Sequence, residues 1–327
     1  MIRDLRIAII GAGMGGLTAA AAFVRFGATV KIFEQADKFS RAGAGIQMSP
    51  NAMKVLRGLS LERQICSLAF QPNTWNNRTW NTGEVKFELA LGASAKEKYG
   101  APYLQMHRGD LHEALLSAVS PDIITLDKRL VDVVQLNSGC SLTFADGTKF
   151  EADLVIAADG IHSRMREIII DTEPPTITGR TAYRATFPSS RLRFPVGECT
   201  KWWGPDRHIV VYYVTNRKDE VNFVTSLPDK SWALESYSEI GDINTVREAF
   251  SDFHDEVKEV LRSCPAVLRW AILERKPLHH WSSGSIVLIG DAAHPMTPYM
   301  AQGAAMAMED GVILARAFEQ EANIATA

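Results

Sequence analysis

The sequence predicts an α/β fold: a Rossmann-like domain that carries an inserted lobe with an antiparallel sheet. Three observations support this prediction. A glycine-rich turn joins an apolar strand to a helix near the N-terminus, two later apolar strands also end in glycine turns, and the middle of the chain alternates polar and apolar residues. The chain has 327 residues, which is enough for a large domain with a second lobe and an enclosed ligand.

Composition excludes several classes of protein. Hydrophobic residues make up 46% of the chain and charged residues 22%, which is typical of a globular domain and not of a disordered or collagen-like chain. The net charge is −3 and no Lys/Arg run stands out, so we expect no nucleic acid partner. The longest apolar runs are too short for a membrane span, and the first residues do not form a signal peptide.

The four cysteines, Cys66, Cys140, Cys199 and Cys264, lie far apart without CxxC spacing. This pattern favours neither a disulfide framework nor a zinc site. We therefore expect no metal and a cytoplasmic location.

Residues 5–33 have the pattern of a dinucleotide-binding unit. Leu5–Ile10 is apolar except for Arg6 and predicts a strand buried on both faces. Leu17–Phe26 is rich in alanine and predicts a helix, and Thr29–Phe33 predicts a second strand. The turn between the first strand and the helix fits GxGxxG, and an acid follows the second strand, as dinucleotide binding requires.

Each position of this turn has its own physical reason. Gly11 allows the tight turn, Gly13 leaves room for a pyrophosphate beside the backbone, and Gly16 lets the helix and strand pack closely. The helix N-terminus faces the phosphates, and Glu34 would accept hydrogen bonds from a ribose. Flavin and nicotinamide enzymes share this unit, so it does not decide between them.

Three further glycine-containing segments favour a flavin. They are the loop of residues 41–46, the turn after a predicted strand at Leu154–Ala157, and the turn after a predicted strand at Ile286–Ile289. The last turn contains Asp291, and a long helix opens at Gly303. A carboxylate at a strand end and a glycine at a helix start suit a ribityl hydroxyl and a flavin carbonyl.

In this order, the segments resemble the group A flavin-dependent aromatic hydroxylases. The resemblance covers nearly the whole chain and implies FAD as cofactor, NADH or NADPH as reductant and O2 as co-substrate. In that family the GxGxxG turn binds the ADP part of FAD, the Asp-Gly segment serves FAD and the nicotinamide, and the Gly-Asp segment holds the ribityl chain. The implied cofactor-binding residues are Gly11, Gly13, Gly15, Gly16, Glu34, Gln35, Arg41, Gly45, Arg108, Asp159, Asp291, Pro298, Gly303 and Ala304.

The middle of the chain is similar to the branch of this family that hydroxylates 6-hydroxynicotinate. The similarity rests on residues 107–112, 197–213 and 300–303. It implies that Cys199, His208 and Tyr212 bind the substrate, together with Gln47. Because that branch has a histidine where this chain has Gln47, the exact ring stays open.

Alternating polar and apolar residues between Pro72 and Leu91 and from Thr181 to Leu227 predict an antiparallel sheet. Residues 71–102 and 176–275 would form the substrate-binding lobe, in which the apolar spacing of Asn244–Leu261 predicts an outer pair of helices. Residues 1–70, 103–175 and 276–327 would form the FAD-binding domain. Within Arg207–Val214 the period of two places His208 and Tyr212 on one face of a strand.

The resemblance implies an FAD-dependent NAD(P)H monooxygenase that hydroxylates a hydroxylated aromatic or pyridine carboxylic acid, through a flavin C4a-hydroperoxide and with loss of CO2. His208 and Tyr212 are the catalytic candidates, because either side chain could bind or deprotonate the ring hydroxyl. A salicylate-type hydroxylase, a catalytically impaired FAD-binding module and a nicotinamide dehydrogenase stay open as alternatives.

The family usually continues for several dozen residues past the helix at Gly303. We therefore expect that this chain, which stops at Ala327, is truncated or lacks the C-terminal helices. Whether the protein is a monomer or a homodimer stays open.

Overall fold

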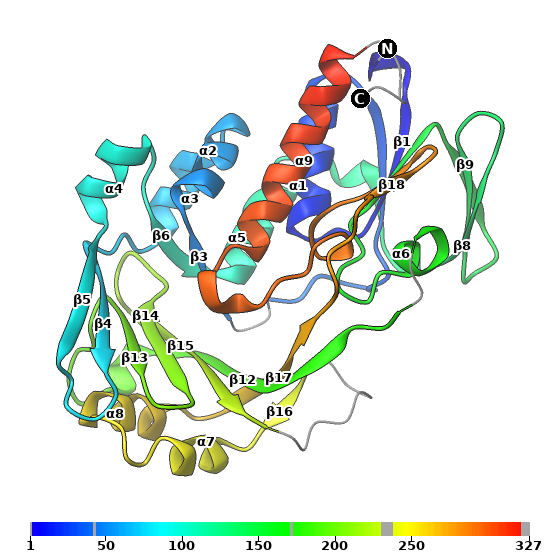
Figure 1. The fold of residues 1–327 in the computed structure, drawn as a ribbon. Coiled ribbons are helices and arrows are strands. Elements are labelled where there is room, and N and C mark those ends of the chain that lie inside the picture. Colours follow the sequence, from blue (N-terminus) through cyan, green and yellow to red (C-terminus); the bar gives the residue numbers. More distant parts are fainter. Residues whose placement is uncertain (1, 42–43, 171–172, 230–237, 322–327) are drawn as a thin grey trace.

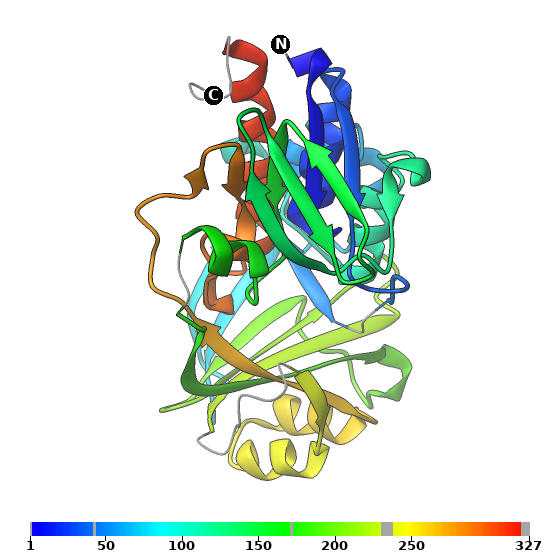
Figure 2. The same cartoon turned by 90° about the vertical axis from the view of Figure 1, so that its right-hand side faces the viewer.

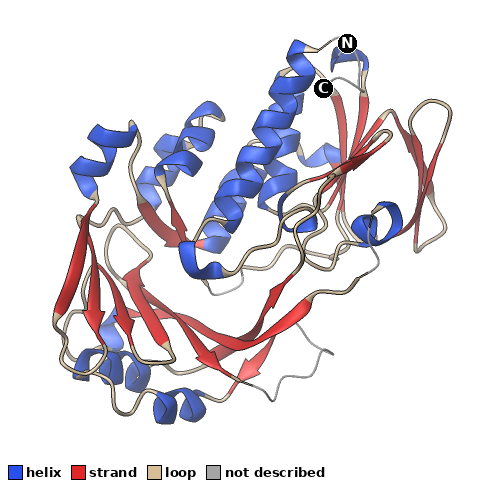
Figure 3. Ribbon diagram, viewed as in Figure 1, coloured by secondary structure: helices blue, strands red, loops and turns tan. Residues whose placement is uncertain are grey.

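The computed structural model describes residues 2–41, 44–170, 173–229 and 238–321. Two sheets of different type face each other across the molecule (Figure 1). The predicted loop residues Ala42 and Gly43 lie outside the described residues. The colouring by secondary structure in Figure 3 separates a helix-rich half from a half built mainly of strands.

The first sheet has six strands in the order β18-β19-β11-β1-β2-β7, and its pairs are parallel except for β18 with β19. Its strands are β1 (Arg6–Ile10), β2 (Thr29–Phe33), β7 (Ile124–Thr125), β11 (Leu154–Ala157), β18 (Ser282–Ser283) and β19 (Ile286–Leu288). Ile7 is in register with Leu154 and Val30. The central strand β1 is buried along four of its five residues, as expected for a parallel sheet covered on both faces.

Helices α1 (Met14–Arg25) and α9 (Gly303–Gln320) lie side by side against this sheet (Figure 1). Their contact needs a residue without a side chain, since a Cβ on Gly311 would lie 2.7 Å from the backbone nitrogen of Ala19. The rings of Phe23 and Phe318 meet edge to face at 5.7 Å. This packing fixes the N-terminus of α9 near that of α1.

The second sheet has eight strands in the order β16-β17-β12-β15-β14-β13-β4-β5. They are β4 (Thr74–Thr79), β5 (Val85–Ala90), β12 (Thr176–Pro188), β13 (Cys199–Trp203), β14 (His208–Tyr213), β15 (Glu220–Pro228), β16 (Ser238–Gly241) and β17 (Val267–Glu274). All neighbours are antiparallel except β13 and β4, which run parallel.

Helices α7 (Ile243–Ala249) and α8 (Asp255–Ser263) cover the outer face of this sheet (Figure 2). Their apolar residues pack with Ile209, Val211 and Tyr213 of β14. The opposite face of the sheet is turned toward the first sheet (Figures 1 and 2).

Smaller elements connect the two halves. The other strands are β3 (Gly45–Met48) with β6 (Leu104–His107), and the antiparallel sheet β8 (Leu130–Gln135), β9 (Cys140–Phe144) and β10 (Lys149–Ala152). The other helices are α2 (Pro50–Gly58), α3 (Glu62–Leu68), α4 (Gly92–Tyr99), α5 (Arg108–Leu116) and α6 (Arg164–Ile169). Short 3-10 helices span Ile2–Asp4, Pro121–Ile123, Ser189–Arg191, Gly290–Ala292 and Pro298–Met300.

Candidate active site

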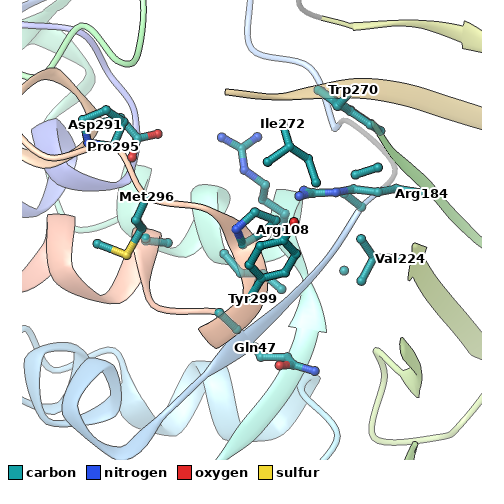
Figure 4. A pocket seen from close by; sticks show the side chains of 18 of the residues that line it. Gln47, Arg108, Arg184, Val224, Trp270, Ile272, Asp291, Pro295, Met296 and Tyr299 are labelled. Atoms are coloured by element: carbon teal, nitrogen blue, oxygen red, sulfur yellow. The ribbon is translucent and has the colours of Figure 1, made fainter. Parts of the chain in front are cut away.

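A cavity of about 490 Å³ lies between the two sheets. The glycine turn, β3 and the start of α9 line one side, and β12, β13, β14, β15 and β17 line the other. Figure 4 shows Asp291 and Met296 at one end, Arg184, Val224 and Trp270 at the other, and Tyr299 and Arg108 between them. A cavity of this size, at the junction of two lobes, is typical of a small-molecule site.

The glycine turn has the geometry that its sequence predicts. Gly11 has φ +101°, and a Cβ there would lie 2.4 Å from the Ala158 carbonyl oxygen. A Cβ on Gly16 would lie 2.0 Å from the Gly11 carbonyl oxygen, so only glycine allows the close packing at this point. Gly13 lines the cavity and a Cβ there would meet no atom within 4 Å. The turn therefore leaves open space beside Gly13, at the N-terminus of α1.

Three predicted residues at the edge of this turn do not line the cavity. The carboxylate of Glu34 accepts hydrogen bonds from the backbone N–H groups of Ala12 (2.8 Å) and Ala36 (2.9 Å). It therefore holds the turn in place. Gln35 is exposed, and the exposed Arg41 pairs with Asp110 at 2.8 Å.

Asp159 is also placed beside the cavity wall rather than on it, because Ala158 and Gly160 are the lining residues there. Its carboxylate accepts from the Ser163 hydroxyl at 2.6 Å and from the backbone N–H of Met165 at 3.1 Å, at the start of α6. Burial raises the pKa of Asp159, and these hydrogen bonds act against that shift. Asp159 thus shapes the turn that forms the wall.

Asp291, the predicted ribityl-binding residue, lies on the cavity wall in the turn after β19. Desolvation by the surrounding protein raises the pKa of its carboxyl, and the nearby side chains of His294 and Arg108 act against this shift. Arg108 lines the cavity as well (Figure 4). The predicted residues that the cavity brings together are Gly13, Gly15, Gly45, Gln47, Arg108, His208, Tyr212, Asp291, Pro298, Gly303 and Ala304.

His208 and Tyr212 face the cavity from the same side of β14, as the period of two predicts. Burial, with Lys201 and Arg180 nearby, lowers the pKa of His208 to about 3. The imidazole is therefore neutral near pH 7 and can accept a hydrogen bond, but the low pKa makes it a weak base in the ligand-free cavity. Burial raises the pKa of Tyr212 above its ordinary value, so its hydroxyl stays protonated and can donate a hydrogen bond.

Gln47 and Cys199 meet at the floor of the cavity. The Tyr103 hydroxyl donates to Gln47 Oε1 at 2.9 Å, and Gln47 Nε2 donates to Cys199 Sγ at 3.8 Å. Gln47 lines the cavity, whereas the fully buried Cys199 does not. Burial raises the pKa of the Cys199 thiol. Cys199, expected from the sequence to contact a ligand, therefore contacts the side chain of Gln47 and does not lie on the cavity wall.

The lining residues that sequence reasoning missed include the polar and aromatic side chains of Arg184, Lys201, Trp270 and Tyr299. Lys201 stands two residues after Cys199, so strand alternation could have placed both on one face. The Tyr299 ring meets the His208 ring edge to face at 5.6 Å, and its hydroxyl lies 3.3 Å from that of Ser226. Nothing in the local sequence indicates this contact, because Ser226 and Tyr299 belong to different lobes.

The charges on the wall favour an anionic ligand. Arg108, Arg184 and Lys201 face the cavity, and Asp291 is the one acidic residue among the lining residues that the structure describes. Within the same described residues, no group of three or more His, Cys, Asp or Glu side chains could hold a metal ion. No helix in the described part of the chain combines the length and apolar character needed to cross a membrane.

A glycine turn on a parallel sheet, opening on a cavity beneath an antiparallel sheet, is the arrangement of a dinucleotide-binding enzyme. The family model of an FAD binding domain matches residues 4–323. The chain belongs to this family.

Named relatives agree with this family. The chain is 43% identical to 6-hydroxynicotinate 3-monooxygenase of Bordetella bronchiseptica over 96% of this chain and 83% of the relative. The enzyme of the same name from Pseudomonas fluorescens is 42% identical over 98% of this chain and 84% of the relative. The structure of Klebsiella pneumoniae HpxO with FAD and uric acid superposes with a TM-score of 0.88 at 25% identity, over 99% of this chain and 82% of that one.

The residues on the wall fit FAD. Gly13 leaves space where a side chain would fill it, and the first turn of α1 has no side-chain cap, so its backbone N–H groups are available to a phosphate. Asp291 and the uncapped start of α9 lie further along the same cavity. These groups match a pyrophosphate, a ribityl chain and a flavin carbonyl.

Proposed function

We propose that this protein is an FAD-dependent monooxygenase that uses NADH or NADPH and O2 to hydroxylate a hydroxylated aromatic or pyridine carboxylic acid, with loss of CO2. A 6-hydroxynicotinate-like acid is the proposed substrate. The observation that carries the proposal is a single cavity that joins the glycine turn and Asp291 to a cationic wall with His208 and Tyr212.

The lobes have separate tasks in this proposal. Residues 1–70, 103–175 and 276–327 bind FAD, and residues 71–102 and 176–275 bind the ring. Bound FAD supplies the oxygen-transfer chemistry. The sheet side of the cavity excludes water with apolar residues such as Val210, Val224 and Ile272, which this chemistry requires.

The proposed catalytic step is proton transfer from the ring hydroxyl. His208 faces the cavity in its neutral form near pH 7, so one of its ring nitrogens can accept the hydrogen bond of the ring hydroxyl. The carboxylate of a bound acid raises the pKa of His208, which lets the imidazole take up the proton. Electron density then moves onto the ring carbon that is hydroxylated. Tyr212 donates a hydrogen bond to the same ring, and Gln47 positions it from the floor.

The test is oxidation of NADH and of NADPH by the purified, FAD-loaded protein, with 6-hydroxynicotinate, with salicylate and without either acid, combined with product analysis. We expect 6-hydroxynicotinate to stimulate oxidation and give a dihydroxypyridine. Stimulation only by salicylate would replace the pyridine acid with a benzene acid. Bound FAD without stimulation by either acid would contradict the proposal.

A variant separates the role of His208 from cofactor binding. His208→Ala should lower product formation by about 100-fold and leave FAD content near that of the wild type. Equal loss of both would overturn the assignment.

We also propose a cytoplasmic location, supported by the free thiols of Cys66, Cys140, Cys199 and Cys264.

A further inference from the structure

Lys201 is a buried cation on the substrate side of the cavity. Its side chain is 4% exposed and lines the cavity. The described part of the chain shows no hydrogen bond or ion pair of the Lys201 Nζ, which lies 3.8 Å from the centre of the Trp203 ring. Buried ammonium groups are normally paired, because an unpaired one costs stability.

The register of the sheet places Lys201 at one end of a row that crosses four strands. Lys201 is opposite Val210, Val210 is opposite Val224, and Val224 is opposite Arg184. All four line the cavity. With about 4.8 Å between neighbouring strands, the row has a cation at each end and two valines between them. The apolar surface formed by the two valines has a width that suits an aromatic ring.

The two cations differ in their surroundings. The guanidinium of Arg184 lies 5.4 Å from the centre of the Trp270 ring, on the side of β17. Lys201 lies beside the row formed by Trp203, His208 and Ser226. His208 is the proposed acceptor of the ring proton, so an anion on Lys201 would hold the ring next to that acceptor.

We propose that Lys201 binds the carboxylate of the ring substrate, with the ring lying over Val210 and Val224. This inference rests on the proposed function, because it takes the substrate to be a ring acid. The proposed function gave no residue that binds the substrate carboxylate, and this inference assigns that role to Lys201.

The stability of the ligand-free protein distinguishes a binding role from a structural one. Replacement of an unpaired buried cation by an apolar side chain of similar length removes a desolvation cost. Lys201→Met should therefore unfold at the same urea concentration as the wild type or a higher one. A lysine needed for the fold would give the opposite result.

The direct test is calorimetric titration of the FAD-loaded protein with two pairs of ligands, 6-hydroxynicotinate with its amide and salicylate with salicylamide. We expect the wild type to bind at least one acid about tenfold or more tightly than its amide. Lys201→Met should bind the acid and the amide equally, and Lys201→Arg should keep part of the preference. Lys98→Met is the matched control, because Lys98 lies 5.1 Å from the Tyr99 ring but outside the cavity.

An unchanged preference in Lys201→Met would overturn the inference, and so would a wild type that binds neither acid. Calorimetry needs no turnover, so this result is separate from the proposed function. A preference that depends on Lys201 without any hydroxylated product would leave the inference standing and contradict the monooxygenase.

Discussion

His294 Nε2 lies 2.6 Å from Asp310 Oδ2, and the same carboxylate oxygen accepts a hydrogen bond from the backbone N–H of Gly290 at 2.8 Å. Asp310 belongs to α9, whereas Gly290 and His294 flank Asp291 in the turn after β19. One carboxylate of the helix thus fixes the turn that presents Asp291 to the cavity.

Replacement of Asp310 should weaken FAD binding although its side chain is outside the cavity lining. Asp310→Ala leaves the Gly290 N–H and His294 without their acceptor, which should cost about 1–3 kcal/mol of stability. We expect lower FAD content after purification and a higher dissociation constant for FAD in fluorescence titration. Glu319→Ala, at an exposed position of the same helix, is the control. Full FAD content in Asp310→Ala would show that the turn keeps its conformation without Asp310.

The same pair predicts a dependence of stability on pH. The hydrogen bond to Asp310 is the main cause that raises the pKa of His294, and burial acts in the opposite direction. Because the folded pKa is the higher one, the stabilisation is complete below the unfolded value of about 6.5 and is lost as pH rises through the folded value. In urea unfolding, the stability advantage of the wild type over Asp310→Asn should be larger at pH 6 than at pH 9. An equal advantage at both values would contradict this.

Gly13 offers a sharp test of the cofactor site. A methyl group there meets no protein atom within 4 Å but would stand in the cavity. Gly13→Ala should therefore fold normally and lose most of its FAD. Gly58→Ala, which also has open space around it but lies outside the cavity, should keep its FAD. Absorbance spectra of the purified variants compare the two.

The alkaline side of the activity profile should report on Lys201. Burial lowers the pKa of Lys201 to about 8. His208 on β14 is the titratable group beside it, and Arg184 lies at the other end of the row on β12. Loss of the ammonium charge should weaken binding of an acid, so kcat/KM should fall above about pH 8. Lys201→Arg should move this fall to higher pH, because arginine stays charged. A fall at the same pH in both proteins would assign it to another group.

Gln47 should matter for stability as well as for binding. Gln47→Leu leaves the buried Tyr103 hydroxyl without the acceptor it has at 2.9 Å, at a cost of about 1–3 kcal/mol. The double variant with Tyr103→Phe removes both partners and should recover part of that loss. Urea unfolding of the single and double variants measures the coupling, and strictly additive losses would contradict it.

Local patterns predicted the first sheet well. Thr29–Phe33 and Leu154–Ala157 are β2 and β11 without a change of bounds, because short segments rich in β-branched and apolar residues beside glycine turns identify buried parallel strands. Helix α1 begins at Met14, earlier than the predicted Leu17, since the last glycines of the turn are already helical. Strand alternation likewise placed His208 and Tyr212 on one face.

The rest depends on pairing between distant segments. The carboxylate of Asp159 accepts a hydrogen bond from Ser163, and Asp159 does not line the cavity. The sequence does not show which of these two surroundings the carboxylate takes. The row from Lys201 to Arg184 exists only through the register of four strands. Tyr299 reaches His208 from the other lobe. No spacing along the chain encodes these contacts.

The parallel pairing of β13 with β4 has a consequence for synthesis of the protein. Thr200 pairs with Asn76, so the β4–β5 hairpin leaves the ribosome long before its neighbour exists. Until then, the edge of β4 that later pairs with β13 lies open. Because such long-range pairings form slowly and leave strand edges open, a stall of synthesis between β5 and β13 should favour aggregation.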